Sequence, residues 1–390
     1  MNTRAMHYLP QLDEAGLVAL LREWREEHPA MGVLALLPEA EQGRVEILQR
    51  AFRAGKVPLV GAIFPALIVH GHFRSEGVWL LRLDAMPFAA LHPDLPLDPE
   101  AMERAVDAMV AGLRPHLGTQ PDVTLFLLCD AMLPNIGTML DQLYLRLANR
   151  VHYMGANAGS ERFQPMPCLF DAERVVGHGV LALLLPHHRG AIVEHGYHVP
   201  PTMITATSTA GNRILQIDWR PAFDVYRELA QAQYCVTIDR DNFYRYAVHF
   251  PFGIVRANGI IVVRIPVALE EDGSLFCVGE VPPNAMLTLL EAPAVDSEHT
   301  LRTLCAGLAE ANGPLAGREL LLFYCAGRRM HLGLEAAAAE VAALAERSAV
   351  ATVAGALSLG EIGSTTQWGY PLFHNATLVA SMWEGAPLEP

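Results

Sequence analysis

The order of apolar and polar positions near the start of the chain predicts a β-α-β unit. Met31–Leu37 is short and almost continuously apolar, which is typical of a strand buried on both faces. In Gln42–Ala54 the apolar residues recur at helical spacing, which indicates a helix with one buried side. Leu59–Phe64 is again a short apolar run and predicts the second buried strand of the unit.

The same pattern returns twice further along the chain. In each copy a short apolar run is followed by a segment of helical periodicity and then by another apolar run. The chain is therefore expected to contain repeated β-α-β units. The second copy comprises Val123–Leu128, Asn135–Ala148 and a strand that begins with Val151–Met154. The third comprises Glu319–Tyr324, Glu335–Arg347 and Val350–Ala354.

A Gly-Ala pair stands where the second strand of each unit is expected to end. The pairs are Gly61-Ala62, Gly155-Ala156 and Gly355-Ala356. A glycine at the end of a strand lets the backbone turn sharply or approach a ligand closely. Because ligands of open α/β sheets bind outside the carboxyl ends of strands, the pairs indicate a ligand site there. The alternative is that they form only tight turns.

Between the second and third units the pattern becomes β-rich. Runs of alternating β-branched residues are separated by the turn signals Ala210-Gly211-Asn212 and Glu271-Asp272-Gly273. A helix is predicted over Asp218–Ala232, and an aromatic-rich stretch follows it. The expected strands are Gly177–Leu185, Ala191–His195, Thr202–Thr207, Arg213–Ile217 and Ile260–Val267.

These patterns predict an α/β fold of two intimately packed halves, in which mixed β-sheets are covered by helices. We place the division near Tyr234, so that the first domain covers residues 1–233 and the second covers residues 234–390. No low-complexity segment or glycine- and serine-rich linker separates the halves, so we expect them to pack together rigidly.

Composition narrows the classes of function. The net charge is −14, from 28 basic and 42 acidic residues, and there is no run of Lys or Arg, so nucleic acid is not an expected partner. No apolar stretch reaches the roughly 20 residues of a membrane-spanning helix, and the start does not resemble a signal peptide. We therefore expect no membrane segment and a cytoplasmic protein. The six cysteines form no CxxC motif and are expected to be reduced thiols.

The last third of the chain holds the densest set of polar residues. No phosphate-binding loop, dinucleotide fingerprint, zinc-protease motif or nucleophile elbow is present. Arg328, Glu361, His374 and Asn375 instead follow predicted strand ends and could converge. An arginine suits a carboxylate and a glutamate suits an ammonium group, so the set fits a small zwitterionic ligand. The alternatives are a buried structural ion pair with caps, or acid–base catalysis by the same side chains.

Histidines are unevenly distributed. The chain has 16 of them, and several fall within the β-rich stretch from Gly177 to Val199. Imidazole is the commonest metal ligand, and a hairpin joining Val180–Leu185 to Ala191–His195 would bring histidines towards a sheet edge, where they could bind iron or zinc. Their spacing matches no zinc pattern, and turn histidines are often merely solvated. Non-covalent haem is permitted, whereas CxxCH for covalent attachment is missing. The candidates are His187, His188, His195 and His198.

The same polar motifs carry a family resemblance. Cys325-Ala326-Gly327-Arg328, Gly360-Glu361-Ile362-Gly363 and His374-Asn375-Ala376-Thr377 resemble the C-terminal half of FIST sensory domains in order and spacing. Gly155-Ala156-Asn157-Ala158-Gly159 and the segments after it are similar to the N-terminal half. The resemblance spans nearly the whole chain. It departs from the family pattern at Gly196-Tyr197-His198 and at Gly61-Ala62-Ile63-Phe64.

The resemblance implies a bacterial ligand-sensing module and not an enzyme. Gly155 and Asn157, with the four polar residues of the last third, are then expected to bind an amino acid or similar metabolite. Stand-alone members resemble a nitric-oxide-sensing branch that binds haem b non-covalently, in which case one of the four candidate histidines would be the axial ligand. The chain carries no recognisable output domain, so the expected partner is a separate histidine kinase or cyclic-dinucleotide signalling enzyme, and the chain could act as a homodimer.

Overall fold

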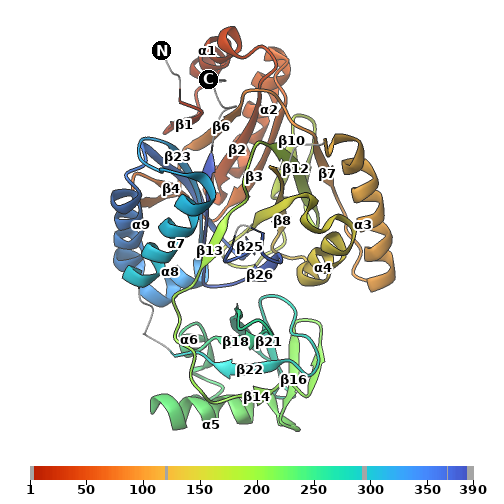
Figure 1. The fold of residues 1–390 in the computed structure, drawn as a ribbon, viewed down its shortest axis with the longest axis vertical. Coiled ribbons are helices and arrows are strands. Elements are labelled where there is room, and N and C mark those ends of the chain that lie inside the picture. Colours follow the sequence, from red (N-terminus) through yellow and green to blue (C-terminus); the bar gives the residue numbers. More distant parts are fainter. Residues whose placement is uncertain (1–3, 119–121, 292–296, 367, 384–390) are drawn as a thin grey trace.

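The chain folds into a main body with a smaller unit beneath it (Figure 1). The computed structural model describes residues 4–118, 122–291, 297–366 and 368–383. The main body contains mixed sheets with helices on their outer faces, which confirms the predicted α/β class. The smaller unit contains mainly short antiparallel strands and two helices, α5 (Ala222–Tyr234) and α6 (Phe243–Ala247).

Within the described ranges, the three predicted β-α-β units are confirmed. In each unit the two strands pair in parallel and a helix lies between them in the chain, preceded in the third unit by the short helix α8 (Ala326–Leu332). A further helix precedes each unit and packs beside the connecting helix. The units are β2 (Gly32–Pro38), α2 (Val45–Gly55) and β3 (Leu59–Phe64); β8 (Val123–Asp130), α4 (Ile136–Leu147) and β9 (His152–Ala158); and β23 (Glu319–Cys325), α9 (Leu334–Ser348) and β24 (Thr352–Ser358). The preceding helices are α1 (Glu14–Glu27), α3 (Pro99–Leu113) and α7 (Ser297–Asn312).

Helix starts follow from local chemistry. The Asp13 carboxylate accepts hydrogen bonds from the backbone N–H groups of Ala15 and Gly16 and so caps α1. Asp98 caps α3 in the same way, 2.9 Å from the nitrogen of Ala101, and Pro99 occupies the first helical position, where no N–H is needed. Each cap supplies an acceptor for backbone donors that the helix itself cannot satisfy.

The main body is built by exchange of strands between the three units. After β3 the chain adds β4 (Leu67–Val69) to the sheet of β23 and β24. After β9 it adds β10 (Leu169–Asp171) to the sheet of β2 and β3, and after β24 it adds β25 (Glu361–Gly363) to the sheet of β8 and β9. The exchange is cyclic, so the three sheets are related by an approximate threefold arrangement.

Each of the three sheets has the same strand plan. A parallel pair lies in the middle, an antiparallel strand from the same unit flanks one side, and the exchanged hairpin flanks the other. The first sheet also contains β1 (Met6–Leu9), β6 (Val78–Leu83) and β11 (Val175–Val176); the second contains β7 (Ala89–His92), β12 (Val180–Pro186) and β26 (Leu372–His374); and the third contains β5 (His72–Arg74), β13 (Ile192–Glu194) and β27 (Leu378–Trp383).

The Gly-Ala pairs lie inside their strands and not at the strand ends, so this prediction was wrong. Each strand continues two residues beyond its pair, to Phe64, Ala158 and Ser358. The glycines are needed because a Cβ would lie 2.5, 2.1 or 1.8 Å from the carbonyl oxygen of the neighbouring parallel strand. The alanines that follow them are fully buried in the core of the body. Close packing, rather than a turn, explains the pairs.

The smaller unit has its own hydrophobic core. Tyr226 of α5 and Phe243 of α6 have ring centroids 5.9 Å apart, and Tyr226 also packs on Phe252. The strands of this unit form two small sheets. They are β14 (Ile204–Thr205), β18 (Phe252–Val255), β19 (Ile261–Arg264) and β22 (Met286–Leu289), and then β15 (Ser208–Ala210), β16 (Arg213–Ile217), β17 (Arg220–Pro221), β20 (Pro266–Leu269) and β21 (Leu275–Cys277).

The predicted hairpin and the predicted domain division have different outcomes. The expected hairpin between Val180–Leu185 and Ala191–His195 is wrong, because β12 pairs with β7 and β8 whereas β13 pairs with β27 of another sheet. The division into residues 1–233 and 234–390 stays a prediction. Strands from both of these halves share the second and third sheets, so the halves are intimately packed.

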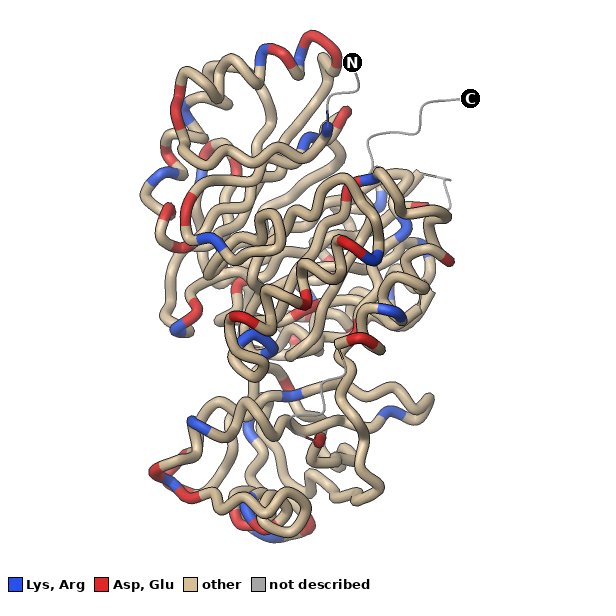
Figure 2. The backbone as a smooth tube through the Cα atoms, turned by 90° about the vertical axis from the view of Figure 1, so that its left-hand side faces the viewer, with Lys and Arg blue, Asp and Glu red and all other residues tan. Residues whose placement is uncertain are grey.

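Charged residues of both signs are spread along the chain. Figure 2 shows Lys and Arg interspersed with Asp and Glu over both the main body and the smaller unit. Over the described ranges, no helix has the length and apolar character needed to cross a membrane.

Candidate functional site

The predicted residue Glu361 lies in a buried polar corner of the main body. Its carboxylate accepts hydrogen bonds from Ser358 Oγ at 2.5 Å and from Thr377 Oγ1 at 2.6 Å. The thiol of Cys325 also bonds to Glu361, and Cys325 Sγ accepts the N–H of Ala376 at 3.0 Å. We call Cys325, Ser358, Glu361 and Thr377 the polar corner. Burial raises the pKa of Glu361 to about 7, against the opposing effect of these donors.

The threefold plan of the body shows that Glu361 is exceptional. It lies opposite Ala156, the alanine of a Gly-Ala pair, on an exchanged strand. The corresponding positions on the other two exchanged strands are Leu67, opposite Ala356, and Leu169, opposite Ala62. The same place in the fold is therefore filled by leucine twice and by a fully buried carboxyl group once. A buried carboxyl group is costly, so packing alone does not explain it.

Arg328 forms a buried ion pair. Its guanidinium donates to Glu340 of α9 through Nε at 2.8 Å and through Nη2 at 2.6 Å, and Tyr324 donates to the same carboxylate at 2.6 Å. Nη1 donates to the carbonyl oxygens of His195 and Ala376. This geometry matches the alternative of a structural ion pair, with the guanidinium used to join α8 (Ala326–Leu332), α9 and neighbouring loops.

His374 and Asn375 lie beside the polar corner. Both are buried, and burial lowers the pKa of His374 well below its usual value, so its imidazole is neutral. The Asn375 amide accepts the N–H of Ile265 and donates to the carbonyl of His374. Asn375 and Cys325 also line a cavity of about 200 Å³ between the body and the smaller unit.

Gly155 and Asn157 both lie on β9 but have different surroundings. A Cβ on Gly155 would lie 2.1 Å from the carbonyl oxygen of Leu127, so this glycine serves strand packing. Asn157 lies near the carboxyl end of the strand and lines a cavity of about 390 Å³. The predicted ligand residues are thus divided between the polar corner, the Arg328 ion pair and this cavity.

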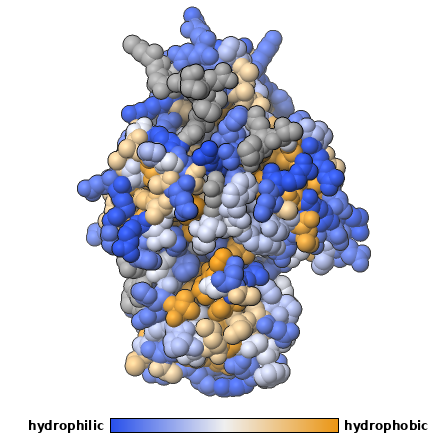
Figure 3. Space-filling view, viewed as in Figure 1, coloured by the Kyte–Doolittle hydropathy of each residue, from blue (hydrophilic) through white to orange (hydrophobic). Residues whose placement is uncertain are grey.

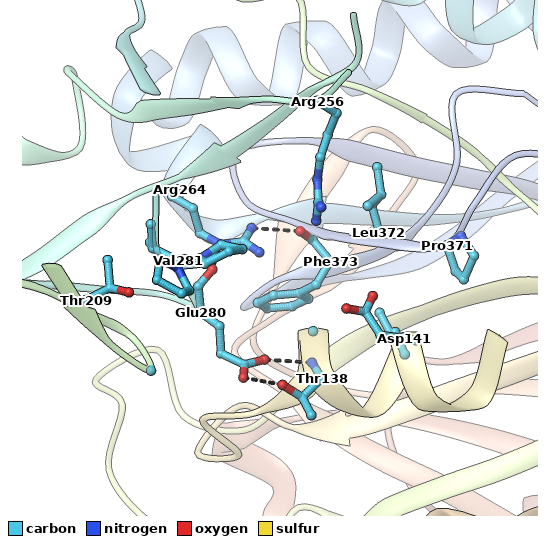
Figure 4. Close-up of a pocket in the computed structure, with 15 residues that line it drawn as sticks. Thr138, Asp141, Thr209, Arg256, Arg264, Glu280, Val281, Pro371, Leu372 and Phe373 are labelled. Carbon is cyan, nitrogen blue, oxygen red and sulfur yellow. Dashed lines mark hydrogen bonds between the residues drawn. The ribbon is translucent and has the colours of Figure 1, made fainter. Parts of the chain in front are cut away.

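A further cavity, of about 310 Å³, lies between α4 of the body and the smaller unit, and we call it the arginine cleft (Figure 4). Arg256 and Arg264 line it from the smaller unit, and Asp141 lines it from α4. Figure 4 shows both guanidinium groups on one side of the cleft and the Asp141 carboxylate across from them. In Figure 3 apolar side chains are also exposed where the body meets the smaller unit.

The walls of the arginine cleft are held by hydrogen bonds. The Glu280 carboxylate accepts from the N–H of Thr138 at 2.7 Å and from its hydroxyl at 2.6 Å, at the N-terminus of α4, where negative charge is favoured. Arg264 donates to the carbonyl oxygens of Phe373 at 2.7 Å and Glu280 at 2.9 Å. Burial lowers the pKa of Arg264 to about 10, which leaves it charged at neutral pH. Arg256 Nε is buried and has no hydrogen-bond partner among the described residues.

Sequence reasoning missed the residues of this cleft. A usable signal was present for Arg264, which interrupts the apolar run Ile260–Val267 that we predicted as a strand. A charged residue inside such a run is buried only if something compensates its charge. Asp141 gave no such signal, because it lies on the polar side of the α4 helix.

The four candidate histidines do not converge. His187 and His198 are exposed. His188 is buried, which lowers its pKa to about 3, and its Nδ1 lies 2.9 Å from the hydroxyl of Thr124. His195 Nδ1 accepts the N–H of Tyr197 at 2.9 Å, and burial lowers its pKa to about 4. Within the described ranges, no group of three or more His, Cys, Asp or Glu side chains is placed to hold a metal ion.

The residues around His187 and His188 do not fit haem. His187 and His188 share a cavity of about 270 Å³ that also contains the charged residues Asp84 and Arg189. This volume is below the roughly 300–1,000 Å³ of ordinary small-molecule sites, and haem is a large, mostly apolar ligand. We therefore derive no step through haem. Haem b and nitric oxide binding stay predictions of the family resemblance.

Fold and cavities together define an α/β protein with ligand-sized clefts between its main body and a smaller unit. Comparison with known families agrees with this class. The FIST N domain model matches residues 33–220 and the FIST C domain model matches residues 222–364. The chain belongs to the FIST family, whose domains are sensory and are associated with small-ligand sensing in signal transduction. No curated protein matches the chain.

Proposed function

We propose that this protein is a signal-transduction sensor that binds a small zwitterionic metabolite, such as an amino acid, in the arginine cleft. The observation that carries the proposal is the placement of Arg256, Arg264 and Asp141 around one cavity. A ligand carboxylate would accept charge-assisted hydrogen bonds from the guanidinium groups, and a ligand ammonium group would donate to Asp141. The sequence analysis expected an arginine and a glutamate for such a ligand, and here two arginines and an aspartate at other positions supply the same charges.

The position of the cleft suits a sensor. The two arginines belong to the smaller unit, whereas Asp141 belongs to the main body. A ligand that contacts both parts favours one arrangement of the two and so shifts the equilibrium between conformations. We propose that the output goes to a separate histidine kinase or cyclic-dinucleotide enzyme that recognises this arrangement.

The test is a thermal-shift screen of the purified protein with the twenty common amino acids, followed by calorimetric titration of any that stabilise it. Arg256→Met keeps the apolar stem but removes the charge, and it should weaken binding about tenfold or more, because hydrogen bonds to charged groups contribute about 1.5–3 kcal/mol. Arg245→Met is the matched control, since Arg245 is an exposed arginine of the same unit that lies outside the cleft.

Two outcomes would contradict the proposal. One is that no amino acid raises the melting temperature, and the other is that Arg256→Met binds as tightly as Arg245→Met. An absorption spectrum with and without haem, in the ferrous state before and after nitric oxide, tests the gas-sensor function separately. A Soret band that shifts with nitric oxide would favour that function in place of the zwitterion sensor.

A further inference from the structure

A second cavity at the junction has a different chemistry from the arginine cleft. It has a volume of about 390 Å³ and lies where the carboxyl ends of β8 and β9 meet the smaller unit. Phe373 lines both this cavity and the arginine cleft. We call it the asparagine cavity, and the residues that carry the argument are Asn157, Arg162, Asn212, Tyr244 and Phe276.

Two buried amides of this cavity have unsatisfied oxygens. Asn157 is 1% exposed and Asn212 is 8% exposed, and the Oδ1 atom of each has no hydrogen-bond partner among the described residues. Buried polar atoms are nearly always paired, so each exception needs an explanation. Asn157 belongs to β9 of the body, whereas Asn212 lies between β15 and β16 of the smaller unit. The two residues therefore line one cavity from both parts of the molecule.

The backbone around both amides is fixed. Asn157 donates its N–H to Gly360 at 2.8 Å and accepts the N–H of Leu359 at 3.0 Å. The Asn212 carbonyl accepts the N–H of Cys277 at 2.8 Å. A Cβ on Gly360 would lie 3.3 Å from Asn157 Nδ2, so this glycine leaves room for the amide. The backbone that carries the two amides is thus held in place before any ligand arrives, which lowers the cost of binding.

The charge of the lining limits the ligand class. Among the described residues that line the cavity, Arg162 is the single charged one, and it is exposed. The described lining contains no carboxylate for an ammonium group, so a zwitterion would leave its cation unpaired there. A primary amide presents one acceptor and a donor side by side, which complements the amide or amidine edge of a nitrogen heterocycle. Phe276 and Tyr244 supply aromatic surface on which a flat ring can stack.

We propose that the asparagine cavity binds a neutral nitrogen heterocycle of the nucleobase class, with one edge on Asn157 and another on Asn212. Such a ligand would bridge the main body and the smaller unit at a site separate from the arginine cleft. The proposal does not depend on the zwitterion sensor, because Phe373 is the single described residue that lines both cavities.

The experiment is calorimetric titration of the full chain with adenine, guanine and uracil, with glycine as a zwitterionic comparison. At least one base should bind, and Asn157→Leu or Asn212→Leu should weaken it about tenfold or more. Asn135→Leu is the matched control. Asn135 is also a buried asparagine with an unpaired Oδ1, but it lies outside the cavity.

Tyr244→Ala gives a second test in case the two buried asparagine variants do not fold. Tyr244 is 71% exposed, so its truncation should leave the fold intact. It should weaken base binding by about fivefold or more through lost stacking. The proposal is overturned if none of the three bases binds, or if the affinity is the same in Asn157→Leu, Asn212→Leu and Tyr244→Ala as in the control. Neither result would affect amino acid binding that depends on Arg256. Failure of the nucleobase proposal can therefore be distinguished from failure of the zwitterion sensor.

Discussion

His249 and His331 face each other across the junction, with their Nδ1 atoms 2.8 Å apart. His249 follows α6 of the smaller unit, and His331 belongs to α8 of the main body. A contact this short requires a proton on one Nδ1 and a lone pair on the other, so it exists only while at least one ring is neutral. Burial lowers the pKa of both residues, and Arg328 and the neighbouring ring help to lower that of His331 to about 4.

The histidine pair predicts that the free energy of unfolding falls in acid. The folded state favours the neutral form of His331, so its contribution is complete above the unfolded pKa of 6.5 and is lost as the pH falls towards about 4. Urea unfolding at pH 7.5 and 4.5 measures this. The pair should contribute about 1–2 kcal/mol to the difference once solvent screening is allowed for. In His331→Phe the difference in the free energy of unfolding between pH 7.5 and pH 4.5 should be smaller by this amount. An unchanged difference would contradict a lowered pKa of His331.

The polar corner predicts an opposite dependence for Glu361. Its pKa is raised from 4.5 to about 7, so the folded state holds the proton more tightly than the unfolded chain. The resulting stability is complete below pH 4.5 and is lost as the pH rises through about 7, with a total effect of about 3 kcal/mol. Glu361→Gln cannot ionise. Its free energy of unfolding relative to wild type should therefore rise between pH 5 and pH 8. A difference that does not change with pH would show that Glu361 keeps an ordinary pKa.

The Arg328–Glu340 ion pair predicts a large loss of stability when one partner is removed. Glu340→Gln leaves the guanidinium buried without its counter-charge, which should cost about 3–5 kcal/mol in urea unfolding. Glu298→Gln is the control. It removes the carboxylate that pairs at the surface with Arg347, which lies on α9 like Glu340, and surface ion pairs contribute about 0–1 kcal/mol. Equal effects of the two substitutions would refute a structural role for the buried pair.

Gly360 predicts a steric effect at the asparagine cavity. A Cβ there would lie 2.4 Å from the ring of Phe373, which also packs against Gly279 of the smaller unit. Gly360→Ala should therefore lower the free energy of unfolding by about 1–3 kcal/mol, as overpacking of a core does. Gly43→Ala is the control, because no atom of the described ranges lies within 4 Å of its Cβ position. The idea fails if thermal unfolding of the two variants is the same.

The sequence predicted the repeated units well, because their strands and helices are long and regularly patterned. Within the units, Leu59–Phe64 was predicted with the bounds of β3, and in the smaller unit Arg213–Ile217 was predicted with those of β16. The strand exchange could not be predicted in this way. β4, β10 and β25 are each three residues long, and their partners are set by tertiary packing and not by local pattern.

The candidate site was predicted less completely. Glu361 was singled out from its motif, but neither its hydrogen-bond partners Ser358 and Thr377 nor the partner of Arg328 was predicted. Glu340 lies on the same side of α9 as Ala337 and Leu344, which are buried. A charged residue on the apolar side of an expected helix is a signal that sequence reasoning could have used. The arginine cleft was missed because its side chains come from segments distant in sequence, which only the fold brings together.

The cyclic exchange of strands has a consequence for how the chain can be divided. Each unit completes a sheet that begins in another unit, so removing any one of them leaves two sheets with open edges. A fragment of residues 1–233 would keep β4 and β13 but lose β24 and β27, with which they pair. Such edges invite pairing between chains. The body is therefore expected to fold in a single cooperative step. None of its three units is expected to fold when it is expressed alone or moved into another protein.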